Sequence, residues 1–189
     1  MIIDCPVCNG KGTAESTTKT ENIPYFGEVM ESSLICNACG YKHNDIISLE
    51  QKDPIKLTLA INKDTLSSRV IKSQSATVSI PELGLKVEPG PKSLGYVSNV
   101  EGVITRFEEG VNRALTIFDD DESQKNGLAI LEKLDKLIAG MLEATLIIED
   151  PFGQSNLMDI NVKKEELTKE ELKNLKTGFA IIEDINPED

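Results

Sequence analysis

The chain contains four cysteines, and their spacing places them in two CxxC pairs, Cys5 with Cys8 and Cys36 with Cys39. Two residues between thiolates allow both sulfurs of one tight turn to face a single ion. Two such turns together supply the tetrahedral, all-sulfur ligand set that zinc favours, with Zn–S distances of about 2.3 Å. The 27 residues between the pairs are enough for a long hairpin. The sequence therefore predicts one zinc ion bound by all four cysteines.

Other chemistry at these positions is less consistent with the sequence. Disulfides are disfavoured in a reducing cytoplasm, and a thioredoxin-like motif would need a CxxC that opens a helix in a βαβ unit. His43, the only histidine, follows Cys39 by four residues and could act as an alternative ligand or hydrogen-bond to a sulfur. With four cysteines available, an ordinary loop histidine is the simpler interpretation. A four-thiolate site leaves no position for water or substrate, so we expect a structural zinc.

Strands are expected to position these cysteines. The segment STTKTENIPYFGEVMESSLI between the pairs is typical of two strands joined near Pro24, and we expect a zinc ribbon over residues 1–50. In residues 51–189, IKLTLAIN alternates between apolar and polar residues, which is the period of a half-buried strand. LMDINVK alternates in the same way, with Met158, Ile160 and Val162 on one face. Further strands are indicated by these segments: SSRVIKS, ATVSIPEL, LGLKVEP, ATLIIED and FAIIED.

At about residues 101–143 the apolar period lengthens to three or four residues, as in amphipathic helices. The first apolar stripe comprises Ile104, Phe107, Val111, Leu115 and Phe118. After the charged turn DDDESQKNG, the second stripe comprises Leu128, Leu131, Leu134, Ile138 and Leu142. Two such helices joined by a short polar loop predict an antiparallel helical hairpin. The overall expectation is a mainly β protein with some α: a zinc ribbon, then a β-rich domain that carries this hairpin.

Composition excludes several classes of function. The formal net charge is −12, whereas a sequence-independent nucleic-acid binder needs an excess of Lys and Arg. No apolar run approaches the roughly 18 residues that span a bilayer, and the start MIIDCPVC lacks the features of a signal peptide, so we expect a cytoplasmic protein without a membrane segment. One histidine cannot supply a histidine-rich metal site or a catalytic triad. A Walker-type glycine loop is missing as well. We therefore expect no enzymatic activity and no small-molecule substrate.

Several motifs, taken in order, resemble those of the ZPR-type zinc finger proteins (zinc finger protein one). CPVC and the later segment TKTENIPYFGEVMESSLICNACGYKHNDI are similar to the zinc-finger signature of that family. GYVSNVEGVI and IEDPFGQSN resemble two further family motifs, so the likeness runs from about residue 5 to 183. Eukaryotic members carry the zinc-plus-β unit twice. This chain carries it once and resembles the single-unit archaeal form, and it has His43 where the family often has Asn.

The resemblance implies bound Zn²⁺ and a β domain similar to a double-stranded β-helix. It also implies a protein-interaction role, in which the chain binds translation elongation factor one-alpha and assists its folding. We expect the partner contacts in exposed turns, at Tyr25, Phe26, Tyr41, His43, Asp150, Gln154 and Asn156. Two structural roles are the alternatives: Tyr25 and Phe26 could pack the ribbon against the β domain, and Asp150 could cap the DPFGQSN turn through its side chain.

The alternative function is that of a zinc-ribbon nucleic-acid-associated regulatory protein, because zinc ribbons bind nucleic acids in transcription proteins. A sheet that reads nucleic acid needs basic residues among its aromatic ones. Here Glu21, Glu28 and Glu31 surround the expected hairpin instead. The sequence therefore favours a protein partner over a nucleic acid.

Overall fold

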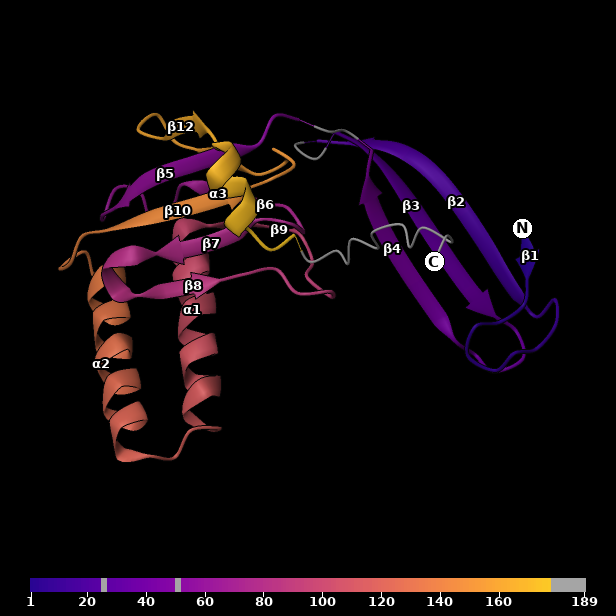
Figure 1. The fold of residues 1–189 in the computed structure, drawn as a ribbon, viewed down its shortest axis with the longest axis horizontal. Helices are drawn as coiled ribbons and strands as arrows, with labels where there is room; N and C mark the ends of the chain where they lie inside the picture. Colours follow the sequence, from indigo (N-terminus) through magenta and orange to yellow (C-terminus); the bar gives the residue numbers. More distant parts are fainter. Residues whose placement is uncertain (25–26, 50–51, 178–189) are drawn as a thin grey trace, which may run out of the picture. The chain divides into compact units, whose positions relative to one another are not determined.

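The computed structural model describes residues 1–24, 27–49 and 52–177, and the chain divides into two compact units, Met1–Gln51 and Lys52–Asp189 (Figure 1). Each unit has its own cluster of buried apolar residues. In the part of the chain that is described, no helix has the length and apolar character needed to cross a membrane.

The first unit is a four-stranded antiparallel sheet in the order β1-β2-β3-β4. Its strands are β1 (Ile2–Ile3), β2 (Ala14–Ile23), β3 (Gly27–Cys36) and β4 (Lys42–Ser48). β2 and β3 pair along their whole length, which confirms the hairpin expected between the cysteine pairs. β4 follows the second CxxC and was not anticipated. Tyr25 and Phe26 lie outside the described residues.

The second unit contains two further sheets. One has the order β12-β5-β10-β7-β8 and the other the order β11-β6-β9. The strands are β5 (Ile55–Ile61), β6 (Arg69–Lys72), β7 (Thr77–Ile80), β8 (Leu85–Val87), β9 (Tyr96–Asn99), β10 (Ala144–Asp150), β11 (Asn156–Met158) and β12 (Lys163–Glu166). A short 3₁₀ helix, η1 (Pro81–Leu83), connects β7 to β8. These strands account for the β-rich domain that the alternating segments predict, while the segment FAIIED lies outside the described residues.

The centre of the larger sheet is the antiparallel pair β5 and β10, which are in register from Ile55↔Asp150 to Ile61↔Ala144. In both strands every second residue is buried, which confirms the period-2 expectation for IKLTLAIN and ATLIIED. The two strands supply seven members of the core: Ile55, Leu57, Leu59, Ile61, Ala144, Leu146 and Ile148. Most of the apolar stabilisation of this unit therefore comes from aliphatic side chains.

Three helices complete the second unit: α1 (Val100–Leu115), α2 (Asp121–Ile138) and α3 (Lys169–Asn174). α1 and α2 form the expected hairpin and run side by side away from the sheets (Figure 1). Asn99 and Asp120 cap their N-termini by accepting hydrogen bonds from the N–H groups of Gly102 and Ser123. α3 begins with a capping box between Thr168 and Glu171.

The predicted stripe of α2 was wrong in two positions, because Leu142 lies beyond the end of α2 at Ile138 and Leu128 is exposed. Leu128 is 59% exposed, whereas Leu134 and Leu137 are fully buried. The buried face instead includes Gly127, where an added Cβ would meet the side chain of Leu115 on α1. The close approach of the two helices at this glycine sets which face of α2 turns inward, and a hydrophobic period alone does not contain that information.

The segment LMDINVK is not one continuous strand, contrary to the alternating pattern. Only residues 156–158 pair as β11, and Ile160 is 97% exposed. The Asp159 side chain accepts a hydrogen bond from the N–H of Asn161 at 2.9 Å and another from the Ser68 hydroxyl. An aspartate that bonds the backbone two residues on forms a turn, and here that turn overrides the strand pattern.

One buried hydroxyl of the second unit gives a test of this core. Thr77 Oγ1 is buried without a hydrogen-bond partner, whereas the Thr65 hydroxyl donates to the Ala60 carbonyl at 2.8 Å. We expect Thr77→Val to raise the free energy of unfolding by about 1 kcal/mol. Valine has nearly the same shape as threonine, and the substitution removes a buried hydroxyl that has no hydrogen-bond partner. Thr65→Val is the matched control and should lower stability by at least about 1 kcal/mol. Urea unfolding checks both changes, and a destabilised Thr77→Val variant would contradict this assignment.

Candidate functional site

The sulfurs of Cys5, Cys8, Cys36 and Cys39 converge at one end of the first unit, all within 4.8 Å of one another. Cys5 Sγ lies 3.8 Å from Cys39 Sγ, and Cys8 Sγ lies 3.8 Å from Cys36 Sγ. A tetrahedron with Zn–S bonds of about 2.3 Å has sulfur–sulfur edges of about 3.8 Å. The sulfur positions therefore fit a zinc ion, and each close pair joins one CxxC to the other.

The two CxxC turns share one backbone design. The N–H of Asn9 donates to the Cys5 carbonyl at 2.9 Å, and the N–H of Gly40 donates to the Cys36 carbonyl at 3.0 Å. Asn9 and Gly40 each directly follow the second cysteine of a pair, and their φ angles are 55° and 73°. Glycine and asparagine tolerate this left-handed conformation better than other residues. The sequence carries a signal for both turns, because an asparagine or a glycine directly follows the second cysteine of each pair, and the expectations drawn from the sequence did not use it.

Hydrogen bonds hold the two turns together. The N–H of Asn37 donates to the Thr13 carbonyl at 2.9 Å, and the N–H of Cys36 donates to the Tyr41 carbonyl at 2.8 Å. Cys5 and Cys36 are 1% exposed and pack with Ala14 and Tyr41. The pairing of strands β2 and β3 thus places the two cysteine turns next to each other, at one end of the sheet.

The electrostatics of the cluster favour a cation. Hydrogen bonds with Thr13 and with the N–H of Cys39 lower the pKa of the Cys36 thiol to about 6. Although the N–H of Tyr41 lowers it, the hydrogen bond with Cys36 and burial raise the pKa of the Cys39 thiol to about 12. The Cys36 sulfur is therefore ready to ionise at neutral pH, while Cys39 resists a second negative charge. A divalent cation at the centre removes this conflict.

The lone histidine is not part of the sulfur cluster. Among the described residues, the group that could hold a metal ion consists of the four cysteines. His43 lies in β4, exposed, and its ring stacks on Tyr41 at a centroid distance of 6.4 Å. All four coordination positions are taken by sulfur, so the zinc has no open position for a substrate.

A second ordered feature is the loop after β10, in the motif DPFGQSN. Asp150 is fully buried at its start, and both carboxylate oxygens are saturated. Five donors point at this carboxylate: Ser75 Oγ at 2.9 Å, Phe152 N at 3.0 Å, Gln154 N at 2.9 Å, Ser155 N at 2.7 Å and Ser155 Oγ at 2.7 Å. The side chain therefore caps the turn, which was one of the two roles considered for it.

The other expected contact residues are distributed over both units. Tyr41 is half-buried against the cysteine cluster, and His43 is exposed beside it. Gln154 is half-buried in the DPFGQSN loop, and Asn156 is exposed at the start of β11. Asp150 has no exposed surface, so any contribution to partner binding is indirect, through the shape of the loop.

The fold and the sulfur site together define a class: a four-cysteine zinc-finger unit joined to a β-rich jelly-roll domain with a few helices. Residues 1–52 match the family model of the ZPR1 zinc-finger domain, and residues 64–178 match the model of the ZPR1 jelly-roll domain. The chain belongs to the ZPR1 zinc-finger family.

Relatives in this family fall into two length groups. A ZPR1-like protein of Methanocaldococcus jannaschii is 41% identical over 96% of this chain and 92% of its own length. A ZPR1-like protein of Pyrococcus horikoshii is 40% identical over 95% of this chain and 82% of its own. The zinc finger chaperone zpr1 of Schizosaccharomyces pombe is 32% identical over 82% of this chain, but the match spans 35% of that protein. The match thus covers most of the two archaeal proteins and about a third of the yeast one.

Removal of zinc should unfold the first unit and spare the second. The buried cluster of the first unit is small and includes two of the cysteines themselves, so this unit depends on the bound metal. The second unit has an extensive aliphatic core of its own. After chelation, hydrogen–deuterium exchange should lose its protection in residues 1–24 and 27–49 and keep it in β5 and β10. Full protection of the first unit without metal would contradict a structural zinc. Because protons compete for thiolates, the apparent zinc affinity should also fall as the pH is lowered.

Asp150→Asn should destabilise the second unit by about 2–3 kcal/mol, because an amide nitrogen would face donors where a charged acceptor now stands. Glu149→Gln is the matched control, since Glu149 makes only a 3.8 Å contact with Lys56, and should change stability by less than about 1 kcal/mol. Urea unfolding of the zinc-loaded protein measures both. Equal effects of the two variants would show that the carboxylate does not organise the loop.

Proposed function

We propose that this protein is a binding and folding factor for a protein client, and that the client is translation elongation factor one-alpha. The observation that carries the proposal is the closed site: four sulfurs occupy the coordination shell, so the metal stabilises a surface and offers no catalytic position. The printed name of the yeast relative, a zinc finger chaperone, supports the same role. The choice of client rests on the family resemblance of the motifs.

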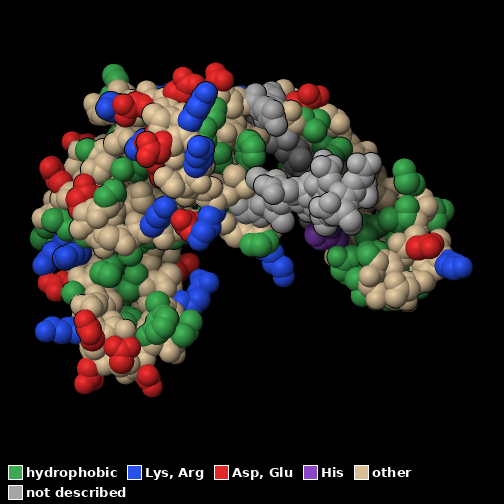
Figure 2. Space-filling view, viewed as in Figure 1, with side chains coloured by type: hydrophobic (Ala, Val, Ile, Leu, Met, Phe, Trp, Pro, Cys, Tyr) green, Lys and Arg blue, Asp and Glu red, His purple; other side chains and the backbone are tan. Residues whose placement is uncertain are grey.

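The charge of the chain fits a protein partner better than a nucleic acid. Residues 1–50 contain seven acidic and three basic residues, and a filled four-thiolate zinc site adds two further negative charges. The visible face of the zinc unit in Figure 2 shows many hydrophobic and few Lys or Arg side chains. Phosphate binding needs the opposite balance. The alternative, a nucleic-acid-associated regulatory protein, therefore has little electrostatic support.

The proposed contacts are exposed polar residues, found separately on each of the two units. His43 on β4 and Asn156 on β11 are both exposed, and each lies on a strand that follows a rigid turn or loop. The zinc site fixes the turn before β4, and Asp150 fixes the loop before β11. Tyr41 and Gln154 are half-buried neighbours that would add contact area. Rigid display of this kind lowers the entropy lost on binding.

We also propose that the protein is not an enzyme and that it acts in the cytoplasm. A folding factor for a translational GTPase needs access to the site of translation, and four thiolates stay reduced there. Any nucleotide in the reaction would belong to the client, because the chain has no Walker-type loop.

The direct test uses purified archaeal elongation factor one-alpha that has been unfolded in denaturant and diluted. The zinc-loaded protein should raise the yield of factor able to bind GTP, and the two proteins should co-purify during refolding. The double variant His43→Ala, Asn156→Ala should bind at least about ten-fold more weakly. Asn112→Ala, at an exposed polar position on α1, is the control and should bind like the parent protein.

Two results would count against the proposal. If the yield of refolded factor does not rise and no complex is detected, elongation factor one-alpha is excluded as the client. Saturable capture of RNA by the zinc unit at physiological salt, with no binding of the factor, would favour the nucleic-acid alternative.

A further inference from the structure

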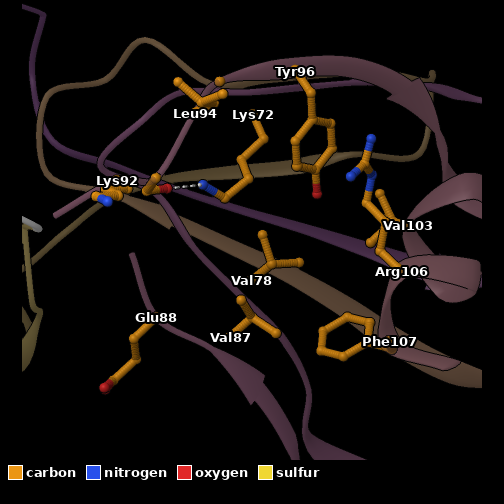
Figure 3. Close-up of a pocket in the computed structure, with 12 residues that line it drawn as sticks. Lys72, Val78, Val87, Glu88, Lys92, Leu94, Tyr96, Val103, Arg106 and Phe107 are labelled. Carbon is orange, nitrogen blue, oxygen red and sulfur yellow. Dashed lines mark hydrogen bonds between the residues drawn. The ribbon is translucent and has the colours of Figure 1, made fainter. Parts of the chain in front are cut away.

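A cavity of about 520 Å³ lies in the second unit (Figure 3). Strands β6 to β9, the segment between β8 and β9, and helix α1 all contribute to its wall. Part of that wall is apolar, and Figure 3 shows Val78, Val87 and Phe107 together there. A volume of this size fits a small organic molecule.

The opposite part of the wall carries Lys72, an almost fully buried cation. Lys72 is 4% exposed, and its Nζ donates to the Ser73 carbonyl at 2.9 Å and to Ser93 Oγ at 3.4 Å. An ammonium has three donors, so these two bonds leave one unused. Within the described ranges, Lys72 forms no ion pair shorter than 4.0 Å. A buried cation with no ion pair within 4.0 Å is costly, because the charge of Asp150 acts on it only from a greater distance, and an anionic ligand would offset that cost.

Arg106 and Tyr96 also favour an anionic ligand in this cavity. The guanidinium carbon of Arg106 lies 4.2 Å from the ring centroid of Tyr96, and Lys72 Nζ lies 5.9 Å from the same centroid. Figure 3 shows the Tyr96 ring between the Lys72 and Arg106 side chains, so one aromatic ring lies near both cations of the cavity wall. Arg106 makes no ion pair with any residue that the structure describes.

The lining has a single acid, and that acid is already neutralised. Glu88 pairs with Lys86 at 3.2 Å and with Lys176 at 2.6 Å. Its carboxylate is therefore not available to Lys72 or Arg106. In a chain of net charge −12, a cavity lined by Lys72, Lys92 and Arg106, which form no ion pair within the described residues, is a local reversal of charge. Burial lowers the pKa of Lys72, and the charge of Arg106 acts in the same direction, while Asp150 opposes them.

We propose that this cationic cavity binds a small amphipathic organic anion. Its carboxylate or phosphate group lies between Lys72 and Arg106, with Tyr96 as a neighbouring hydroxyl donor, and its carbon body lies on Val78 and Phe107. Arg and Lys bind both types of oxyanion through charge-assisted hydrogen bonds, and the apolar wall selects against a bare inorganic ion. The lining residues are different from the zinc ligands and from the residues proposed to contact the client.

The test is calorimetric titration of the zinc-loaded full-length protein at low ionic strength with octanoate and with octyl phosphate. Both should bind saturably at one site, and the tighter of the two identifies the preferred head group. Octanol and octylamine have the same chain without the negative charge and should bind at least about ten-fold more weakly. Added salt should weaken the binding of the two anions and leave the binding of octanol unchanged.

Variants separate this site from general surface binding. Arg106→Gln removes an exposed cation of the cavity and should weaken octanoate at least about ten-fold without loss of folding. Arg113→Gln changes another exposed arginine of the same helix and should leave binding unchanged. Equal affinities for Arg106→Gln and Arg113→Gln, equal binding of octanol and octanoate, or no saturable binding of either anion would overturn the proposal.

Discussion

Four cysteine sulfurs within 4.8 Å of one another cannot all be ionised unless a cation lies between them. This electrostatic constraint governs the end of the first unit where the two cysteine turns meet, because the sulfurs of both turns lie there. Each close sulfur pair connects residues far apart in sequence, Cys5 with Cys39 and Cys8 with Cys36. The metal therefore takes the place of the hydrophobic core that a unit of this size has little room to build.

The second unit also contains buried charges, and hydrogen bonds stabilise them. Its buried Asp150 carries a negative charge that five hydrogen-bond donors satisfy, and its buried Lys72 carries a positive charge nearby. Ser73 connects the two: its carbonyl accepts from Lys72, and its N–H donates to Ser155 Oγ in the Asp150 loop. One strand end thus supports both the DPFGQSN loop and the cationic cavity, so a change at Ser73 would reach both.

Local patterns in the sequence were sufficient for the parts of the fold that depend on local chemistry. CxxC spacing predicted the metal ligands, and period-2 alternation predicted β5 and β10, because a half-buried strand shows its burial in its own sequence. Patterns failed where one specific contact, near or distant in the sequence, decided the outcome. Ile160 is exposed because Asp159 makes a turn, and Leu128 is exposed because Gly127 lets α1 approach α2. The cavity could not be predicted, since Lys72, Tyr96 and Arg106 belong to three separate elements.

The account depends most directly on the composition of the metal shell, and X-ray absorption at the zinc edge of the purified protein measures that shell. We predict one zinc per chain with four sulfur neighbours at about 2.3 Å and no lighter neighbour. A nitrogen or oxygen in the shell, or a zinc bound by only one of the two CxxC turns, would contradict the closed structural site.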